Sequence, residues 1–151
     1  DIAKWWSENI SQDWLSLRSE TYGILQREDT LKEIVKLLGP EALPDEEKLI
    51  LEVARMIKIG ILQQNSFDDV DTYCSPEKQF KLMKLQVDFY NKGQQALKDG
   101  ASLADIRSMN VISLLLKARM DVKDDEMDKL DKLATDMVEQ FKSVTGVKVQ
   151  N

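Results

Sequence analysis

The sequence predicts an all-α fold, a single bundle-like domain of about five to six helices. Through most of the chain, apolar residues recur three and four positions apart, which places them on one face of a helix. No stretch of four or more residues alternates between apolar and polar side chains, as a half-buried β-strand would. We find no internal repeat, and 151 residues are enough for one domain with one core. We therefore assign residues 1–151 to one domain.

The first long helix is predicted for residues 13–38. Its apolar side chains fall at helical spacing, although Gly23 could divide it into two helices. Gly and Pro at 39–40 form a typical stop signal. Before this helix, residues 1–14 hold all three tryptophans, at Trp5, Trp6 and Trp14. We expect them to cover the helical core, because tryptophan burial contributes strongly to packing; the alternative is that they face a partner or another domain.

The second helix is predicted for residues 45–63, and its wide apolar face indicates a central place in the core. Pro44 suits the first turn of this helix, where its missing N–H costs nothing. Asp45, Glu46 and Glu47 follow at the positive end of the helix dipole, where each contributes about 0.3–1 kcal/mol when exposed. This acidic start is either an ordinary charged helix end or a surface offered to a basic partner.

Two further helices follow in the second half of the chain. Ser75 caps the first of them, with Pro76 at its first position, and Gly93 or Gly100 marks its end. Ser102 opens the next helix with a pattern typical of a capping box. We expect that helix to run without interruption through the apolar residues that follow.

The last helix is predicted for about residues 124–142, after a charged connector. Its apolar residues share one face: Met127, Leu130, Leu133, Ala134, Met137, Val138 and Phe141. Residues 143–151 are predicted to form a loose tail, because the last residues of a domain are often held by few contacts.

The composition excludes several classes of function. The net charge is −6 and the pI about 4.8, which argues against a nucleic-acid or anionic-membrane surface, because both need clustered Lys and Arg. The chain has no histidine, which removes the commonest general base and the commonest transition-metal ligand. It also has no Gly-rich phosphate loop and no apolar run of about 18 residues. We expect neither a catalytic residue nor a metal site.

The stretch 62–74 interrupts the helical pattern and is dense in polar groups. It carries two glutamines, an asparagine, a phenylalanine, three aspartates and the only cysteine. It is either a binding site on a rigid scaffold or a corner between helices held by local caps. The aspartates lack the glycine and the distal glutamate of a calcium loop. We expect Cys74 to be a small buried apolar group, since no cationic cluster adjoins it in the sequence.

The residues from 31 to 83 carry a family resemblance. The segments 31–43 and 49–57, and the string Gln-Gln-Asn-Ser-Phe-Asp-Asp-Val-Asp-Thr-Tyr-Cys at 63–74, resemble the C-terminal helical domain of the catalytic A subunit of archaeal A-type and vacuolar V-type ATPases. The tryptophan-rich start and the run 78–83 fit the same family. The resemblance covers roughly residues 5–120, and so long an irregular string rarely arises by chance.

The resemblance implies a rotary motor that makes or hydrolyses ATP. In that family a preceding P-loop domain binds ATP or ADP with Mg²⁺, and the helical domain closes on the nucleotide and pushes the central stalk. Phe67 resembles the aromatic residue that packs on the adenine ring, with Gln63, Gln64 and Asn65 as polar groups near it. Because this chain lacks the P-loop, we expect it to have no ATPase activity by itself and to bind no cofactor alone.

The resemblance also implies a contact with the rotating shaft. The segment that reads Asp-Glu-Leu-Ser-Glu-Glu-Asp in the related F-type β subunit corresponds here to Glu41, Ala42, Leu43, Pro44, Asp45, Glu46 and Glu47. Ala42 replaces an acid and Pro44 replaces the capping serine, which weakens an electrostatic grip and leaves a role for the stiffened turn. A helix of about 18 residues, ~27 Å long, could join this contact to the adenine pocket.

The expected partners are the nucleotide-binding domain of the same subunit, neighbouring B-type subunits and the central stalk, with no nucleic acid and no membrane insertion. The expected location is cytoplasmic, peripheral to the cell membrane in the ATPase head. The chain starts at Asp1 without a signal-peptide pattern, so we interpret it as part of a longer one. The alternative function is a free-standing acidic helical module that binds a partner helix; an enzyme with paired carboxylates fits less well.

Overall fold

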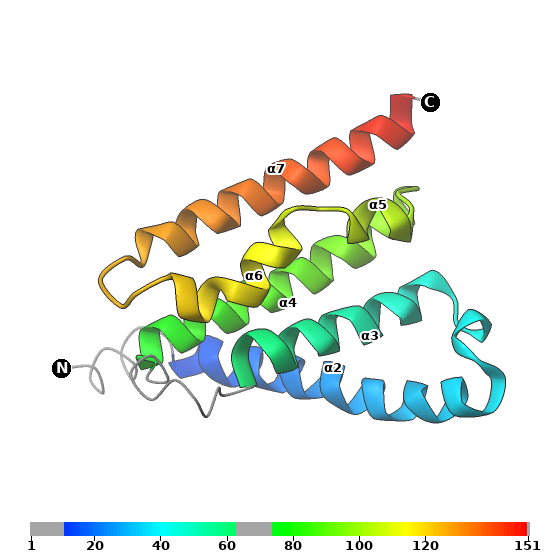
Figure 1. The fold of residues 1–151 in the computed structure, drawn as a ribbon, viewed down its shortest axis with the longest axis horizontal. Helices are drawn as coiled ribbons and strands as arrows, with labels where there is room; N and C mark the ends of the chain where they lie inside the picture. The colour runs from blue at the N-terminus through cyan, green and yellow to red at the C-terminus, as the bar shows by residue number, and fades with distance from the viewer. Residues whose placement is uncertain (1–10, 63–73, 151) are drawn as a thin grey trace.

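The computed structural model describes residues 11–62 and 74–150. Within these ranges the chain forms six α-helices, and no described residue lies in a strand. Their bounds are α2 Ser11–Leu38, α3 Asp45–Ile57, α4 Pro76–Lys98, α5 Leu103–Arg107, α6 Val111–Asp121 and α7 Asp128–Gln150. The long helices alternate in direction, so successive connections lie at opposite ends of the domain (Figure 1). The prediction of an all-α domain is confirmed.

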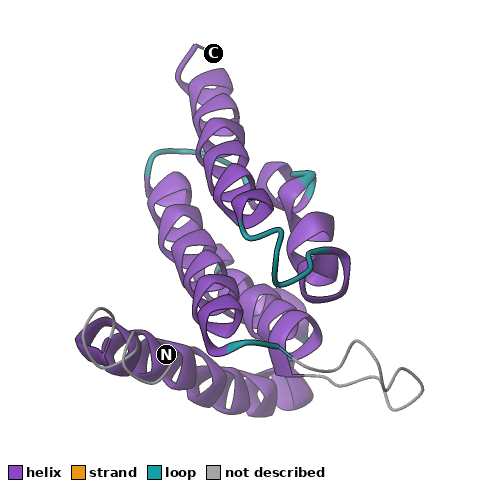
Figure 2. Ribbon diagram, turned by 90° about the vertical axis from the view of Figure 1, so that its left-hand side faces the viewer, coloured by secondary structure: helices purple, strands orange, loops and turns teal. Residues whose placement is uncertain are grey.

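Helices α3 and α4 form the centre of the domain. Helix α4 packs against α2, α3, α6 and α7, while α3 packs against α2, α4 and α6. Six residues of α3 are buried, which confirms the central place predicted from its apolar face. Phe89 of α4 meets Phe141 of α7 with ring centroids 5.3 Å apart. Helix α2 closes one side of this core and α7 the other (Figure 2).

Helix α2 is continuous through Gly23, where the sequence allowed either a break or a continuous helix. Leu17, Ile24 and Leu31 are buried at intervals of seven residues, so every second turn contributes one leucine or isoleucine to the core. The cost of one glycine in a helix interior is about 1 kcal/mol, which burial of this stripe outweighs. At the start of the helix, Trp14 packs on the core and lies 6.3 Å from the ring of Phe80. The other two tryptophans lie outside the described residues.

Helix α3 continues directly into a π-helical segment, η3, at Lys58–Leu62. The predicted helix 45–63 is therefore present, but its last turn is wider than an α-helix. Gly60 allows this turn to lie close to α6 and α4: a Cβ atom there would stand 3.1 Å from the Leu115 carbonyl oxygen and 3.0 Å from Gln86 Nε2. A larger residue at 60 would force these elements apart.

Helix α4 begins and ends as local sequence signals predict. The Ser75 hydroxyl accepts a hydrogen bond from the Lys78 amide at 3.2 Å, as an N-cap does. At the other end Gly100 has φ +101°, and the Ala101 amide donates to the Ala96 carbonyl at 2.9 Å. This is a Schellman motif, in which glycine takes the left-handed position. Gly100 and not the earlier glycine therefore ends the helix.

Two boundaries in the second half differ from prediction. The helix that Ser102 opens stops at Arg107, and α6 starts anew at Val111, whose amide is capped by Gln140 Oε1 of α7 at 2.9 Å. That cap comes from 29 residues away, so local pattern does not reveal it. The predicted end of the last helix at 142 is wrong, because α7 remains helical to Gln150. No helix in the described part is both long and apolar enough to cross a membrane.

Candidate functional site

The residues predicted to contact adenine lie outside the described part of the chain. These are Phe67, Gln63, Gln64 and Asn65. The structure does describe the residues on either side, which are Leu62 at the end of η3 and the residues from Cys74 onward. The predicted shaft contact, in contrast, is described in full. It lies at the other end of the domain, in the connection from α2 to α3 (Figure 1).

The connection from α2 to α3 is a tight turn built on glycine and proline. Gly39 has φ +87°, a conformation that residues with a Cβ rarely adopt, and residues Pro40–Ala42 form a 3-10 turn. The prediction placed Pro44 inside the helix, but it is the N-cap, and its carbonyl accepts from the Glu47 and Lys48 amides, each at 3.0 Å. Two prolines and one left-handed glycine thus restrict the backbone of this turn.

The side chains of the turn divide into a buried anchor and an exposed acidic rim. Leu43 is buried in the core and holds the turn down. Glu41, Asp45 and Glu46 are exposed and Glu47 is half-buried. Glu41 forms an ion pair with Lys48 at 3.0 Å, which neutralises one of the four carboxylates. The remaining negative charge is concentrated on the first turn of α3.

Two exposed leucines adjoin this turn and were not among the predicted site residues. Leu37 is 82% exposed and Leu38 is 72% exposed, which makes them the most exposed large apolar side chains in the described ranges. Leu38 falls at the helical spacing of the apolar residues in this helix, which predicts a place on its buried face. Adjacency alone does not reveal their exposure, since adjacent apolar residues of α3 such as Leu49 and Ile50 are both buried. The turn therefore presents apolar and acidic groups together.

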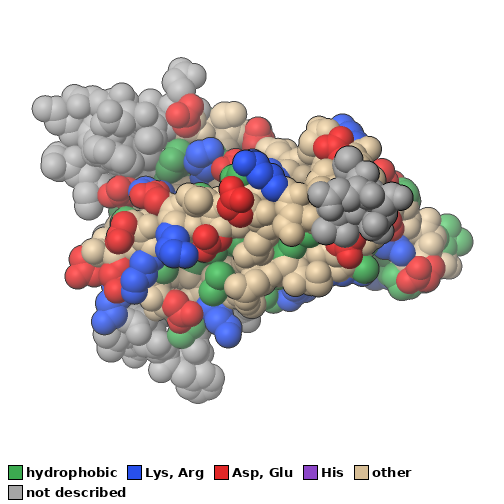
Figure 3. Space-filling model, turned by 90° about the horizontal axis from the view of Figure 1, so that it is seen from above, with side chains coloured by type: hydrophobic (Ala, Val, Ile, Leu, Met, Phe, Trp, Pro, Cys, Tyr) green, Lys and Arg blue, Asp and Glu red, His purple; other side chains and the backbone are tan. Residues whose placement is uncertain are grey.

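Away from the turn, several charged side chains form ion pairs with a neighbour of opposite charge. Lys132 with Asp136 at 3.0 Å and Lys129 with Glu126 at 2.6 Å are examples on and beside α7. The face in Figure 3 accordingly shows acidic and basic side chains interspersed. Among the described residues no group of three histidine, cysteine, aspartate or glutamate side chains is placed to hold a metal ion.

The end of the domain opposite the turn is a junction of η3, α6 and α4. Arg119 of α6 donates through Nη1 to the Ile61 carbonyl at 2.7 Å, and Lys78 of α4 donates through Nζ to the Arg119 carbonyl at 2.6 Å. Cys74 lies half-buried beside these cations. Burial raises the pKa of the Cys74 thiol, although Lys78 and Arg119 act in the opposite direction. Lys78 lies only four residues after Cys74, so the sequence could have indicated it, whereas Arg119 is distant in the chain.

A single helical element connects the two ends. Helix α3 and η3 run without a break from Asp45 to Leu62, about 27 Å at ~1.5 Å per residue. Its side is fixed to α2 by Glu28, a 5% exposed residue whose carboxylate pairs with Lys58 at 2.7 Å and with Lys32 at 3.7 Å. The hydrogen bond to Glu28 raises the pKa of Lys58. The acidic first turn of α3 and Leu62, the residue before Gln63, thus lie on one continuous helical element that is held to α2.

Comparison with known proteins places this fold in a family. The family described as the C-terminal domain of V and A type ATP synthase matches residues 3–107. The chain belongs to this family. Among curated proteins, the A subunit of the A-type ATP synthase of Hyperthermus butylicus is 45% identical over 149 residues, 97% of this chain and 25% of that protein. The corresponding protein of Ignicoccus hospitalis is 44% identical over 146 residues, 95% of this chain and 24% of that protein.

The match identifies a V/A-type ATP synthase C-terminal domain, as the resemblance in the sequence indicated. The chain spans about a quarter of the length of the curated relatives it matches. The Methanococcus maripaludis relative, also an A subunit, is 50% identical over 111 residues, which is 74% of this chain and 19% of that protein. The family match ends at Arg107, the last residue of α5, whereas the Hyperthermus relative aligns over nearly the whole chain. The sequence that forms α6 and α7 is thus covered by the match to that A subunit.

Proposed function

We propose that this domain belongs to the catalytic subunit of an ion-translocating A-type or V-type ATP synthase, where it closes over the adenine of ATP and transmits motion to the central stalk. The observation that carries the proposal is the continuous helix from Asp45 to Leu62, within a domain of this family. One end of this helix begins at the acidic turn, and the other leads directly into the sequence that contains Phe67. A rigid element of this kind can convert closure at one end into displacement at the other.

The turn between α2 and α3 is the proposed stalk contact. Leu37 and Leu38 offer apolar surface, and Asp45 and Glu46 offer exposed negative charge beside it. A stalk helix with apolar and basic residues would satisfy both. Leu43 supports the contact from the core side, because its side chain is buried.

The remaining parts of the proposal concern the assembly. The partners are the nucleotide-binding domain of the same subunit, neighbouring B-type subunits and the central stalk, at the head of the ATPase. ATP and ADP bind with Mg²⁺ to the P-loop domain, and H⁺ or Na⁺ is the transported ion. The A subunit that this chain matches is about four times longer than the chain itself. This supports the proposal that other domains of the subunit bind the phosphates and that this domain alone has no ATPase activity.

The nucleotide contact is tested by Phe67→Ala in the full-length catalytic chain. Removing an aromatic platform from a base costs about 1–3 kcal/mol, so the Kd for ATP should rise roughly 5- to 150-fold. Tyr22→Ala is the matched control, because Tyr22 is an aromatic residue 51% exposed on α2. Both variants are compared by titration with ATP. An unchanged Kd in Phe67→Ala would show that this residue does not contact the base.

The stalk contact is tested by Leu37→Ser with Leu38→Ser in the complete assembly. Losing this apolar surface should lower the torque measured in single-molecule rotation, while ATP binding stays unchanged. Leu15→Ser is the control, since Leu15 is 64% exposed near the opposite end of the same helix. Asp45→Asn with Glu46→Gln separates the contribution of charge. Full torque in both sets of variants would place the stalk contact elsewhere.

A further inference from the structure

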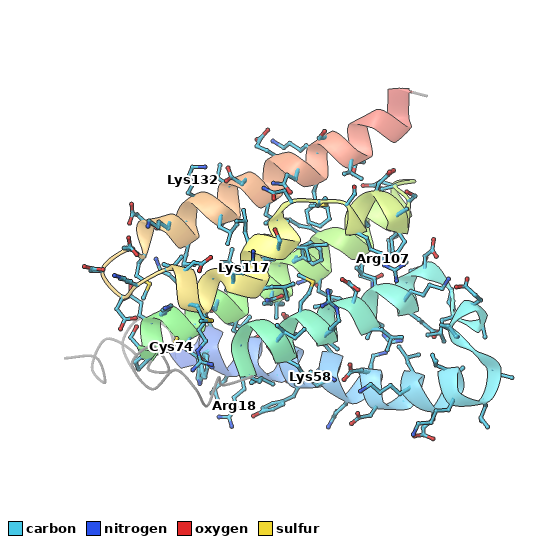
Figure 4. The ribbon with its side chains drawn as sticks, viewed as in Figure 1. Arg18, Lys58, Cys74, Arg107, Lys117 and Lys132 are labelled. Atoms are coloured by element: carbon cyan, nitrogen blue, oxygen red, sulfur yellow. The ribbon has the colours of Figure 1, made fainter. Side chains whose placement is uncertain are left out.

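Three elements that are distant in sequence are tied together at the end of the domain away from the turn. The Ile61 carbonyl belongs to the last turn of η3, and Arg119 Nη1 donates to it at 2.7 Å from α6. The Arg119 carbonyl in turn accepts from Lys78 Nζ, 2.6 Å away, in the first turn of α4. Cys74 marks this end of the domain in Figure 4. One residue of α6 thus links the end of η3 to the start of α4.

The link joins a buried cation, Lys78, to the half-buried Arg119, which makes it geometrically specific. Lys78 is only 4% exposed, and a buried ammonium group is costly unless it is hydrogen-bonded. The Arg119 carbonyl lies in the last turn of α6, where helix carbonyls lack partners within the helix. Close approach is possible because Gly60 leaves no Cβ between η3 and α6. Hydrogen bonds from charged donors are the stronger class, so this link resists separation of the three elements.

The geometry points to Arg119 and Lys78 as positioning residues for the nucleotide contact. They fix the end of η3 relative to the start of α4, and with them Leu62 and Cys74, the described residues that flank the predicted adenine-binding sequence on its two sides. This inference rests on the proposed function, because the contact it serves is the one assigned to Phe67. Neither cation touches the nucleotide; each acts on the backbone from which that sequence continues.

A positioning role predicts an effect on the base and not on the phosphates. The phosphates are assigned to the P-loop domain, whereas the base is assigned to residues that continue from η3 and α4. Loosening the junction should therefore weaken ATP binding without weakening the binding of a ligand that has no base. Tripolyphosphate is such a ligand, and its inhibition constant provides the comparison.

The experiment uses the complete catalytic assembly and four variants: Arg119→Ala, Arg119→Lys, Lys78→Met and, as control, Lys117→Ala. Lys117 is an exposed cation on the same helix, α6. Loss of a hydrogen bond from a charged donor predicts a KM for ATP raised about tenfold in Arg119→Ala, with kcat within about twofold. Lys78→Met should act in the same direction, and Arg119→Lys should recover part of the affinity. The control and the tripolyphosphate constant should not change.

Several outcomes would overturn the inference. One is an unchanged KM in both Arg119→Ala and Lys78→Met while Phe67→Ala raises it; the proposed function then stands and the positioning role fails. Another is equal weakening of ATP and tripolyphosphate, which indicates a general structural defect. If Arg119→Ala does not assemble, Arg119→Lys and Lys78→Met decide by the same comparison. If Phe67→Ala itself has no effect, the proposed adenine contact fails independently.

Discussion

Replacing Gly93 by alanine tests how closely α3 and α4 pack at the centre of the domain. A Cβ atom on Gly93 would stand 2.8 Å from Leu49 Cδ2 and 3.5 Å from Leu49 Cδ1. Leu49 is fully buried, so its side chain has little space into which to move. Gly23→Ala is the matched variant, because Gly23 also lies inside a long helix and its Cβ would meet no heavy atom within 4 Å beyond the adjoining residues and backbone of that helix.

The two variants share one contribution to the free energy of unfolding and differ in a second. Each replaces glycine by alanine in a helix interior, which favours the folded state by about 0.8–1.0 kcal/mol. Only Gly93→Ala adds overpacking, which costs about 1–3 kcal/mol in a close-packed core. Gly23→Ala should therefore be more stable than the unmodified chain, and Gly93→Ala should be less stable than Gly23→Ala by about 1–3 kcal/mol. At about 2–4 °C per kcal/mol, their Tm values should differ by ~2–12 °C.

The assay is unfolding by urea and by heat, followed by circular dichroism of the helices. The free energy of unfolding from urea gives the difference directly, provided that the slope against denaturant is the same in both variants. If Gly93→Ala gains as much stability as Gly23→Ala, the close contact with Leu49 is not a constraint. The reasoning about central packing would then be refuted.

Three further changes have defined outcomes. Ser75→Ala removes the N-cap of α4 and should cost about 1 kcal/mol of unfolding free energy, with faster hydrogen exchange in its first turn. Lys58→Met should destabilise the domain by about 1–2 kcal/mol near neutral pH, because Glu28 keeps only its longer pairing. The folded-state pKa of Lys58 is raised above 10.5, so its stabilising contribution is complete below pH 10.5 and is lost as the pH rises through the raised value. The difference in unfolding free energy between Lys58→Met and the unmodified chain, measured by urea, should therefore disappear at that pH. Gln86→Leu should change the unfolding free energy by less than about 1 kcal/mol, because it loses a 3.4 Å bond to the Met56 carbonyl but removes a buried oxygen that has no partner.

Much of the fold could be predicted because the signals are local. Ser75 caps α4 by accepting a hydrogen bond from an amide only three residues away, and the turn at Gly39 depends on the conformations that glycine and proline allow. The buried stripe of α2 follows from spacing alone. The tight connection between α2 and α3 was found for the same reason, and so was the exposure of its acidic residues.

The features that escaped prediction depend on contacts between distant residues. The break before α6 is stabilised by Gln140 from α7, and Arg119 reaches Ile61 across 58 positions. The composition of η3 does not predict its wide turn either. Glycine is needed at position 60 because the Leu115 carbonyl lies close to it, and that contact cannot be found from the local sequence. The spacing of apolar residues predicts single helices, but it does not predict which helices pack against each other.

The way in which the long helix is held bears on how the proposed function could operate. Its side is paired with α2 through Glu28 and Lys58, and its last turn is bonded to α6 through Arg119. A helix held at its side and at its last turn resists bending and sliding, because either motion would leave a buried carboxylate or a carbonyl without its partner. In the proposed mechanism the domain therefore moves as one body about its connection to the nucleotide-binding domain. The turn at Pro44 then follows the full rotation, instead of a fraction absorbed within the bundle.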